Sequence, residues 1–279
     1  AAGGLAFADV MLPIADGQKP GWKMVEVKAS TSVKRYQEDD VAIQSHIAKR
    51  AGIDLRSIAI AHIDRTWVYP GNGDYRGLLI EQDMTAAAFA RSAEVTAWIA
   101  DAHRVATLTE PPKIAMGPQC SSPFPCGFQT HCSDGLPNTE YPIAWLPHTQ
   151  SQALQDFLAE SGARDMRDVP DALLSPIQHR VRSACLSGHP YFDAQGAQQD
   201  LLRYPLPAYF LDFETIQFGM PRWAGTRPFQ MLPFQFSLHR LDAQGAPTHQ
   251  GFLDLSGNDP SEAFAMALVQ ACAEPLPVF

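Results

Sequence analysis

The chain has 279 residues, which favours two domains, and 46% of them are hydrophobic, enough to form buried cores. The net charge of −9 counts against a generally basic nucleic-acid-binding protein, but a local groove can still be basic and metal ions can offset acidic sites. No apolar run is long enough to cross a membrane, and the first residues lack a signal-peptide pattern. The chain has five cysteines, and this odd number favours the reducing cytoplasm over a secreted disulfide framework.

The first part of the chain has the pattern of an α/β domain with a mixed sheet. The expected elements are strands at residues 5–12, 22–29, 57–68 and 77–81, and helices at 39–51 and 85–107. The strand at 57–68 is apolar nearly throughout, which is typical of a strand covered on both faces.

A first candidate site consists of Asp9, Glu26 and Lys28. Alternate residues of a strand point to the same face, so Glu26 and Lys28 share a face that Asp9, on the neighbouring strand, can reach. Two carboxylates can hold a divalent cation such as Mg²⁺ or Mn²⁺, which would polarise a phosphodiester and activate water. The lysine would orient that water or stabilise the developing charge. The alternative is an ordinary surface Glu–Lys pair, worth less than about 1 kcal/mol.

This arrangement, with Gln44 on the helix that follows, resembles the PD-(D/E)XK nucleases of the RecB type. That family includes nuclease domains of bacterial recombination helicases and of CRISPR adaptation. The resemblance implies a restriction-endonuclease-like fold for residues 1–137, with Asp9, Glu26, Lys28 and Gln44 as catalytic residues and the first two as metal ligands. The tyrosine that often stands four residues after the glutamine in this family is absent.

A loop rich in proline and cysteine at 110–137 contains Cys120, Cys126 and Cys132 with the spacing C-x5-C-x5-C. Thiolates bind zinc or iron–sulfur clusters. RecB-type nucleases of the CRISPR and recombination classes often carry three cysteines after the long helix, so the resemblance implies that these three bind a structural [4Fe–4S] cluster. A Zn²⁺ ion is one alternative, and three unconnected thiols are another.

The rest of the chain is predicted to contain a helical linker and the first part of a further domain. The linker covers residues 138–206 and the domain covers 207–279. In that domain we expect strands at 208–217, 230–241 and 248–255, a helix at 260–273 and a new strand that begins at the last residues. Both ends of the chain have the pattern of a fragment, because each falls directly in a strand-like segment.

The sequence FLDFET, residues 210–215, places Asp212 and Glu214 on one face of the first of these strands, among apolar neighbours that indicate a buried strand. Burying a carboxylate costs on the order of a few kcal/mol unless a cation or hydrogen bonds compensate, so the pair predicts a metal site of the two-metal type. The motif resembles the first motif of DnaQ-like (DEDD) exonucleases with an RNase H-like fold. The wider stretch resembles an uncharacterised bacterial domain commonly fused behind RecB-like nucleases. The remaining acids of a DEDD set are expected beyond Phe279.

The leading hypothesis is a metal-dependent nuclease that degrades DNA exonucleolytically from free or single-stranded ends. It would act in DNA repair, recombination or defence against mobile elements, with a helicase or repair protein as partner. Arg222 and Arg227 can contact phosphates, although a solvated loop explains them equally. Gln235 and His239 can face the same cleft, but such residues are more often ordinary side chains of a sheet. The alternative is a nucleic-acid-binding or assembly module with degenerate nuclease folds.

Overall fold

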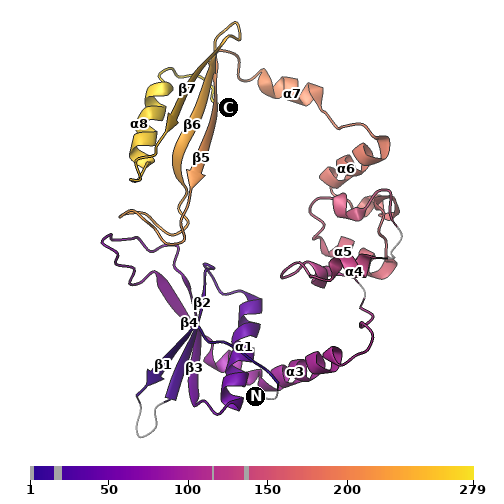
Figure 1. Ribbon diagram of the computed structural model, residues 1–279. Coiled ribbons are helices and arrows are strands. Elements are labelled where there is room, and N and C mark those ends of the chain that lie inside the picture. Colours follow the sequence, from indigo (N-terminus) through magenta and orange to yellow (C-terminus); the bar gives the residue numbers. More distant parts are fainter. Residues whose placement is uncertain (1–2, 16–20, 115, 135–137) are drawn as a thin grey trace. The chain divides into compact units, whose positions relative to one another are not determined.

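The computed structural model describes residues 3–15, 21–114, 116–134 and 138–279 (Figure 1). The chain divides into two compact units: the first joins Ala1–Pro112 with Tyr204–Phe279, and the second is Lys113–Arg203. Among the described residues, no helix is both long enough and apolar enough to cross a bilayer.

The N-terminal sheet is mixed, as the sequence predicts. Its strands lie in the order β1-β2-β3-β4, with the bounds Val10–Ile14, Gly21–Lys28, Leu55–Ile63 and Leu79–Asp83. Strands β1 and β2 are antiparallel, β2 and β3 are parallel, and β3 and β4 are antiparallel. Parallel neighbours need a crossover, and helix α1 (Arg35–Arg50) provides it between β2 and β3.

The core of this sheet is formed mainly by β3 and by the helices that pack on it. Strand β3 is buried from Ile58 to Ile63, which confirms the prediction of a covered strand. The core cluster consists of Met24, Val41, Ala48, Leu55, Ile58, Ile60, Met84 and Ala88. These residues come from β2, α1, β3 and the helix after β4, so burial fixes α1 against the sheet.

The predicted long helix at 85–107 is two helices, α2 (Thr85–Ala90) and α3 (Ser92–Ala106). Arg91, between them, leaves the helical conformation with φ −89° and ψ 9°. Its guanidinium pairs with Asp39 of α1 at 2.7 Å and with Glu94 at 2.7 Å. The interruption therefore coincides with a tertiary ion pair, which a helical periodicity cannot reveal.

The first strand also differs from its prediction at 5–12, because β1 starts only at Val10, which pairs with Val25. The backbone N–H of Val27 donates to the Asp9 carboxylate at 2.8 Å. This side-chain hydrogen bond takes the place of the backbone partner that a longer β1 would supply, so the ladder stops there.

The unit Lys113–Arg203 contains short helices and has a core of its own. Its elements are η1 Pro118–Cys120, α4 Gln129–Ser133, η2 Ile143–Trp145, α5 Gln152–Ser161, η3 Met166–Asp168, η4 Asp171–Leu173, α6 Pro176–Ser187 and α7 Ala194–Leu201. Its core residues are Ile143, Leu146, Leu154, Met166, Val169 and Leu174. The compact unit starts before the cysteines, so the cysteine loop groups with these helices.

The C-terminal sheet is an antiparallel meander with one helix on one face (Figure 1). Its elements are β5 Ala208–Ile216, β6 Leu232–Leu241, β7 Pro247–Leu253 and α8 Ser261–Ala271. The core consists of Tyr209, Phe236, Leu238 and Phe264. The last residues run parallel to β5, since the N–H of Leu211 donates to the carbonyl of Phe279 at 2.8 Å.

Candidate functional site

Four polar side chains from β2 and α1 form one hydrogen-bonded cluster, which we call the Glu26 cluster: Glu26, Lys28, Asp40 and Gln44. The ammonium of Lys28 donates to Glu26 Oε1 at 2.5 Å and to Asp40 Oδ2 at 2.7 Å. The amide of Gln44 donates to Glu26 Oε2 at 2.8 Å and to Asp40 Oδ1 at 3.2 Å. Three predicted site residues thus lie together, because β2 presents alternate residues and α1 crosses that face.

The cluster is only partly removed from water, since the side chains of Lys28 and Asp40 are 22% and 39% exposed. Glu26 and Gln44 are each 6% exposed. Burial lowers the pKa of Lys28, but hydrogen bonds and charge interactions with Asp40 and Glu26 outweigh it, so the pKa of Lys28 is raised. The lysine therefore remains charged at neutral pH and compensates the two carboxylates, which makes burial of Glu26 tolerable.

Asp9 lies beside this cluster but is held by backbone. It precedes β1, and the register that pairs Val10 with Val25 places it opposite Glu26. One of its carboxylate oxygens accepts the Val27 N–H at 2.8 Å. Asp9 therefore lies next to the site residues of β2, as predicted.

The donor chemistry of this region fits a hard divalent cation. The carboxylates of Asp9, Glu26 and Asp40 offer the oxygen ligands that Mg²⁺ prefers. The carbonyl oxygen of Gln44, Oε1, is buried and has no hydrogen-bond partner among the described atoms, which leaves an acceptor for a water or a cation. As the side chains stand, no group of three His, Cys, Asp or Glu residues in the described ranges is close enough to hold a metal ion.

Two residues near this site were missed by the sequence reasoning. Asp40 stands four residues before Gln44 on α1, and this helical spacing puts both on one face, so the signal was available. His62 is buried and pairs with Lys28 in the parallel register of β2 and β3. Only the register could reveal His62, because it is distant in sequence from β2.

The second carboxylate pair is in a different environment. Asp212 and Glu214 share a face of β5, as predicted, but both are exposed, and neither side chain has a hydrogen bond or ion pair within the described residues. The prediction of a buried strand is confirmed only at the start of β5, where Tyr209 is 2% exposed, and is wrong around the acids, where Phe213 is 51% exposed. Phe213 contacts Phe264 of α8 on the opposite face, so the helix covers the apolar side and leaves the acids in water.

The polar neighbours predicted for this pair are partly observed. Gln235 of β6 stands directly opposite Glu214 in the antiparallel register. His239 lies further along the same face of β6, and its ring is 4.6 Å from that of His249 on β7. The open face of the C-terminal sheet therefore carries the acids together with amide and imidazole groups.

The three cysteines of the predicted cluster are free thiols in a loop with little regular structure. Cys120 ends η1, Cys132 lies in α4, and Cys126 between them donates its N–H to the carbonyl of Cys120 at 2.8 Å. Cys126 is exposed and the other two are half-buried. In the described part of the chain, these three cysteines are not gathered into a group that could hold a metal ion.

Fold and sites define an α/β protein with one buried and one open carboxylate site, each on its own sheet. Residues 209–279 match the family model described as "Domain of unknown function (DUF2779)". The match covers β5 to α8 with Asp212 and Glu214, and none of the N-terminal sheet. No curated protein and no solved structure matches the chain.

Proposed function

We propose that this chain is a metal-dependent nuclease that hydrolyses phosphodiester bonds of DNA, acting on single-stranded or free ends. The observation that carries the proposal is the convergence of Glu26, Lys28 and Gln44 on one partly buried hydrogen-bonded cluster, with Asp9 next to it. A buried, charged cluster is costly and is typical of a site that needs those charges.

The residues of the cluster have separable roles in this proposal. Lys28 stays protonated because its pKa is raised, so it can donate hydrogen bonds to a phosphate oxygen or to the attacking water. Gln44 holds the Glu26 carboxylate in place through its amide. A divalent cation bound by Asp9, Glu26 and Asp40 would supply Lewis-acid polarisation of the phosphodiester and a more acidic water.

The connectivity of both sheets supports the same proposal. In the N-terminal sheet, the strand with Glu26 and Lys28 is followed by the helix with Gln44 and then by a parallel strand, the order that the RecB-like PD-(D/E)XK resemblance requires. In the C-terminal sheet, an antiparallel meander and a helix are followed by residues that run parallel to β5. This is the order expected of a DnaQ-like, RNase H-like domain.

The test is cleavage of end-labelled single-stranded and duplex DNA by the purified chain with Mg²⁺ or Mn²⁺. Asp9→Asn keeps an acceptor for the Val27 N–H but removes the charge, and we expect a loss of roughly 100-fold or more in rate. Lys28→Ala should be equally inactive. Lys23→Ala is the matched control, because Lys23 lies on the same strand and pairs instead with Glu81.

The outcomes separate the two carboxylate sites. Cleavage that survives Asp9→Asn and Lys28→Ala but is lost in Asp212→Ala would move the chemistry to the C-terminal sheet. DNA binding without cleavage by the unmodified chain, with either metal, would refute the nuclease. It would leave a nucleic-acid-binding or assembly module, an alternative favoured by the lack of a preformed group of three metal-binding side chains among the described residues.

We also propose that Cys120, Cys126 and Cys132 bind a structural [4Fe–4S] cluster, with Zn²⁺ as the alternative ion, in a cytoplasmic protein. The free state of these three thiols and the proline- and glycine-containing loop between them support it. Anaerobically purified protein should be brown and absorb at about 400 nm. Colourless protein that contains zinc would exclude the iron–sulfur cluster, and protein free of both metals would exclude the site.

A further inference from the structure

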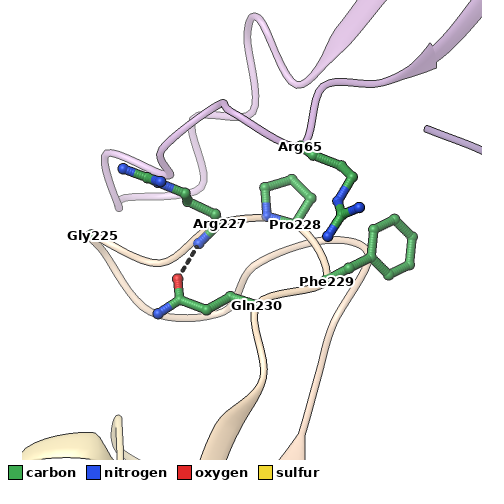
Figure 2. Close-up of a pocket in the computed structure, with 6 residues that line it drawn as sticks. All are labelled: Arg65, Gly225, Arg227, Pro228, Phe229 and Gln230. Carbon is green, nitrogen blue, oxygen red and sulfur yellow. Dashed lines mark hydrogen bonds between the residues drawn. The ribbon is translucent and has the colours of Figure 1, made fainter. Parts of the chain in front are cut away.

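Two adjoining pockets lie in the first compact unit, between the loop after β3 and the loop after β5. One is lined by Arg65, Gly225, Arg227, Pro228, Phe229 and Gln230 (Figure 2). The other shares Arg65 and Phe229 with it and adds Lys34, among other residues. Neither pocket is lined by an aspartate or a glutamate, so both are positively charged in an otherwise acidic chain.

The three cations of these pockets are not neutralised. Lys34, Arg65 and Arg227 form no ion pair with any acid in the described part of the chain, and all three are exposed. Other exposed arginines do find carboxylates: Arg76 pairs with its neighbour Asp74, and Arg104 pairs with an aspartate on its own helix. Unpaired cations around an acid-free hollow provide an attractive field for anions.

Hydrogen bonds between the two loops preorganise this hollow. The N–H of Tyr69 donates to the carbonyl of Thr226 at 2.9 Å, and the N–H of Gly225 donates to the carbonyl of Tyr69 at 2.8 Å. The hydroxyl of Tyr75 donates to the carbonyl of Pro221 at 3.0 Å. These bonds connect the loop that carries Arg65 to the loop that carries Arg227.

The aromatic residue of the pockets is held in an unusual conformation. Phe229 has φ 56°, a left-handed value that is strained for a bulky residue. Its N–H donates to the carbonyl of Phe218 at 2.8 Å, and a Cβ on Gly219 would lie 3.2 Å from its ring. The ring is thus held at the hollow, beside Arg65 (Figure 2).

The position of the pockets relates them to both carboxylate motifs. The second pocket includes Ala29, directly after Lys28, and Gln217, directly after the end of β5. Figure 2 shows Arg65 beside Phe229, while Arg227 extends away on the other side of Pro228. Cations that diverge in this way suit successive phosphates of a strand better than one phosphate, which is best held by converging donors.

We propose that Lys34, Arg65 and Arg227 bind consecutive phosphates of single-stranded DNA while Phe229 stacks on a base. The strand would then lie at the ends of β2 and β5, the strands that carry the two carboxylate motifs. This proposal rests on the proposed nuclease function for its substrate, but it makes a separate claim about binding. Backbone cations combined with an aromatic platform are the usual means of holding single strands without sequence preference.

The test is the binding of labelled oligothymidylate, measured by fluorescence anisotropy. EDTA is present to remove divalent cations, so that metal-dependent cleavage does not occur. We expect Arg65→Ala/Arg227→Ala to raise Kd by about tenfold or more, and to reduce the slope of log K against log salt by about 1.4 for two lost phosphate contacts. The matched control is Arg50→Ala/Arg104→Ala, which removes two exposed arginines outside the pockets and should leave Kd within about twofold. Equal losses in both double variants, or none in either, would overturn the proposal.

A second measurement tests stacking without changing the protein. An abasic strand of the same length should bind the unmodified chain about fivefold or more weakly, because base–aromatic stacking is lost. Equal binding of both strands would overturn the role of Phe229, and inorganic phosphate that competes at equal concentration would overturn recognition of a strand. Binding lost only in the pocket variant, without cleavage by any form, would leave the pocket standing while the nuclease fails. Normal cleavage together with unchanged DNA binding in the pocket variant would support the nuclease and refute the pocket as a binding site.

Discussion

Two pairs of charged residues, Glu26 with Lys28 and Asp212 with Glu214, share one spacing along a strand but differ in what surrounds them. Glu26 and Lys28 on β2 lie under α1, where Gln44 and Asp40 complete a partly buried cluster. Asp212 and Glu214 on β5 lie on the face opposite α8 and have no partner within the described residues. Alternation along a strand decides which residues share a face, and the element that covers that face decides what it costs to place a charge there.

The largest effect that this comparison predicts is on stability at β2. Lys28→Met leaves Glu26 buried beside Asp40 without a cation, so the free energy of unfolding should fall by about 2–3 kcal/mol. Urea unfolding followed by circular dichroism measures it. Lys23→Met, which removes an exposed ion pair with Glu81, should cost less than about 1 kcal/mol. Equal effects of the two variants would mean that the Glu26 cluster is an ordinary surface pair.

A smaller loss is expected from Asp40→Asn. The amide can still accept a hydrogen bond from Lys28, but the charge that holds the ammonium is lost, so stability should fall by about 1 kcal/mol. The matched control is Asp39→Asn, which instead weakens the ion pair with Arg91. If Asp40→Asn reduces DNA cleavage and Asp39→Asn does not, Asp40 belongs to the site and not only to the fold.

The raised pKa of Lys28 predicts a weaker, pH-dependent effect. A cation with a folded-state pKa above its unfolded value of 10.5 stabilises the protein fully below that pH, and the contribution is lost as pH rises through the folded pKa. The stability difference between the unmodified chain and Lys28→Met should therefore be constant from neutral pH to about 10 and shrink at higher pH. A difference that grows above pH 10 would contradict the assignment.

The smallest effect is predicted for the C-terminal pair. Asp212→Ala and Glu214→Ala should change the free energy of unfolding by less than about 0.5 kcal/mol, because both side chains are exposed and unpartnered among the described residues. Removing two adjacent like charges can even stabilise the sheet slightly. A destabilisation as large as that of Lys28→Met would show that Asp212 and Glu214 make stabilising contacts, which contradicts their exposed, unpartnered position. Chemical denaturation of the double variant is the simplest measurement.

Much of the fold could be predicted because it depends on local patterns. The mixed N-terminal sheet, the helix that carries Gln44 and the three-strand meander are all observed near their predicted positions. The errors fall where a tertiary contact overrides periodicity. Arg91 interrupts a helix while it pairs with Asp39, and the Asp9 carboxylate takes the Val27 N–H where β1 would otherwise continue.

The sequence by itself determined which residues face the same way: Glu26 with Lys28, and Asp212 with Glu214, because the strand period is two. It also determined the order of helices and strands, through apolar spacing and turn residues. Only the tertiary structure decided that Glu26 is buried whereas Asp212 and Glu214 are exposed, since this depends on which face a distant helix covers. It alone decided that Arg65 and Arg227 line one hollow, because hydrogen bonds between loops far apart in the chain set that position.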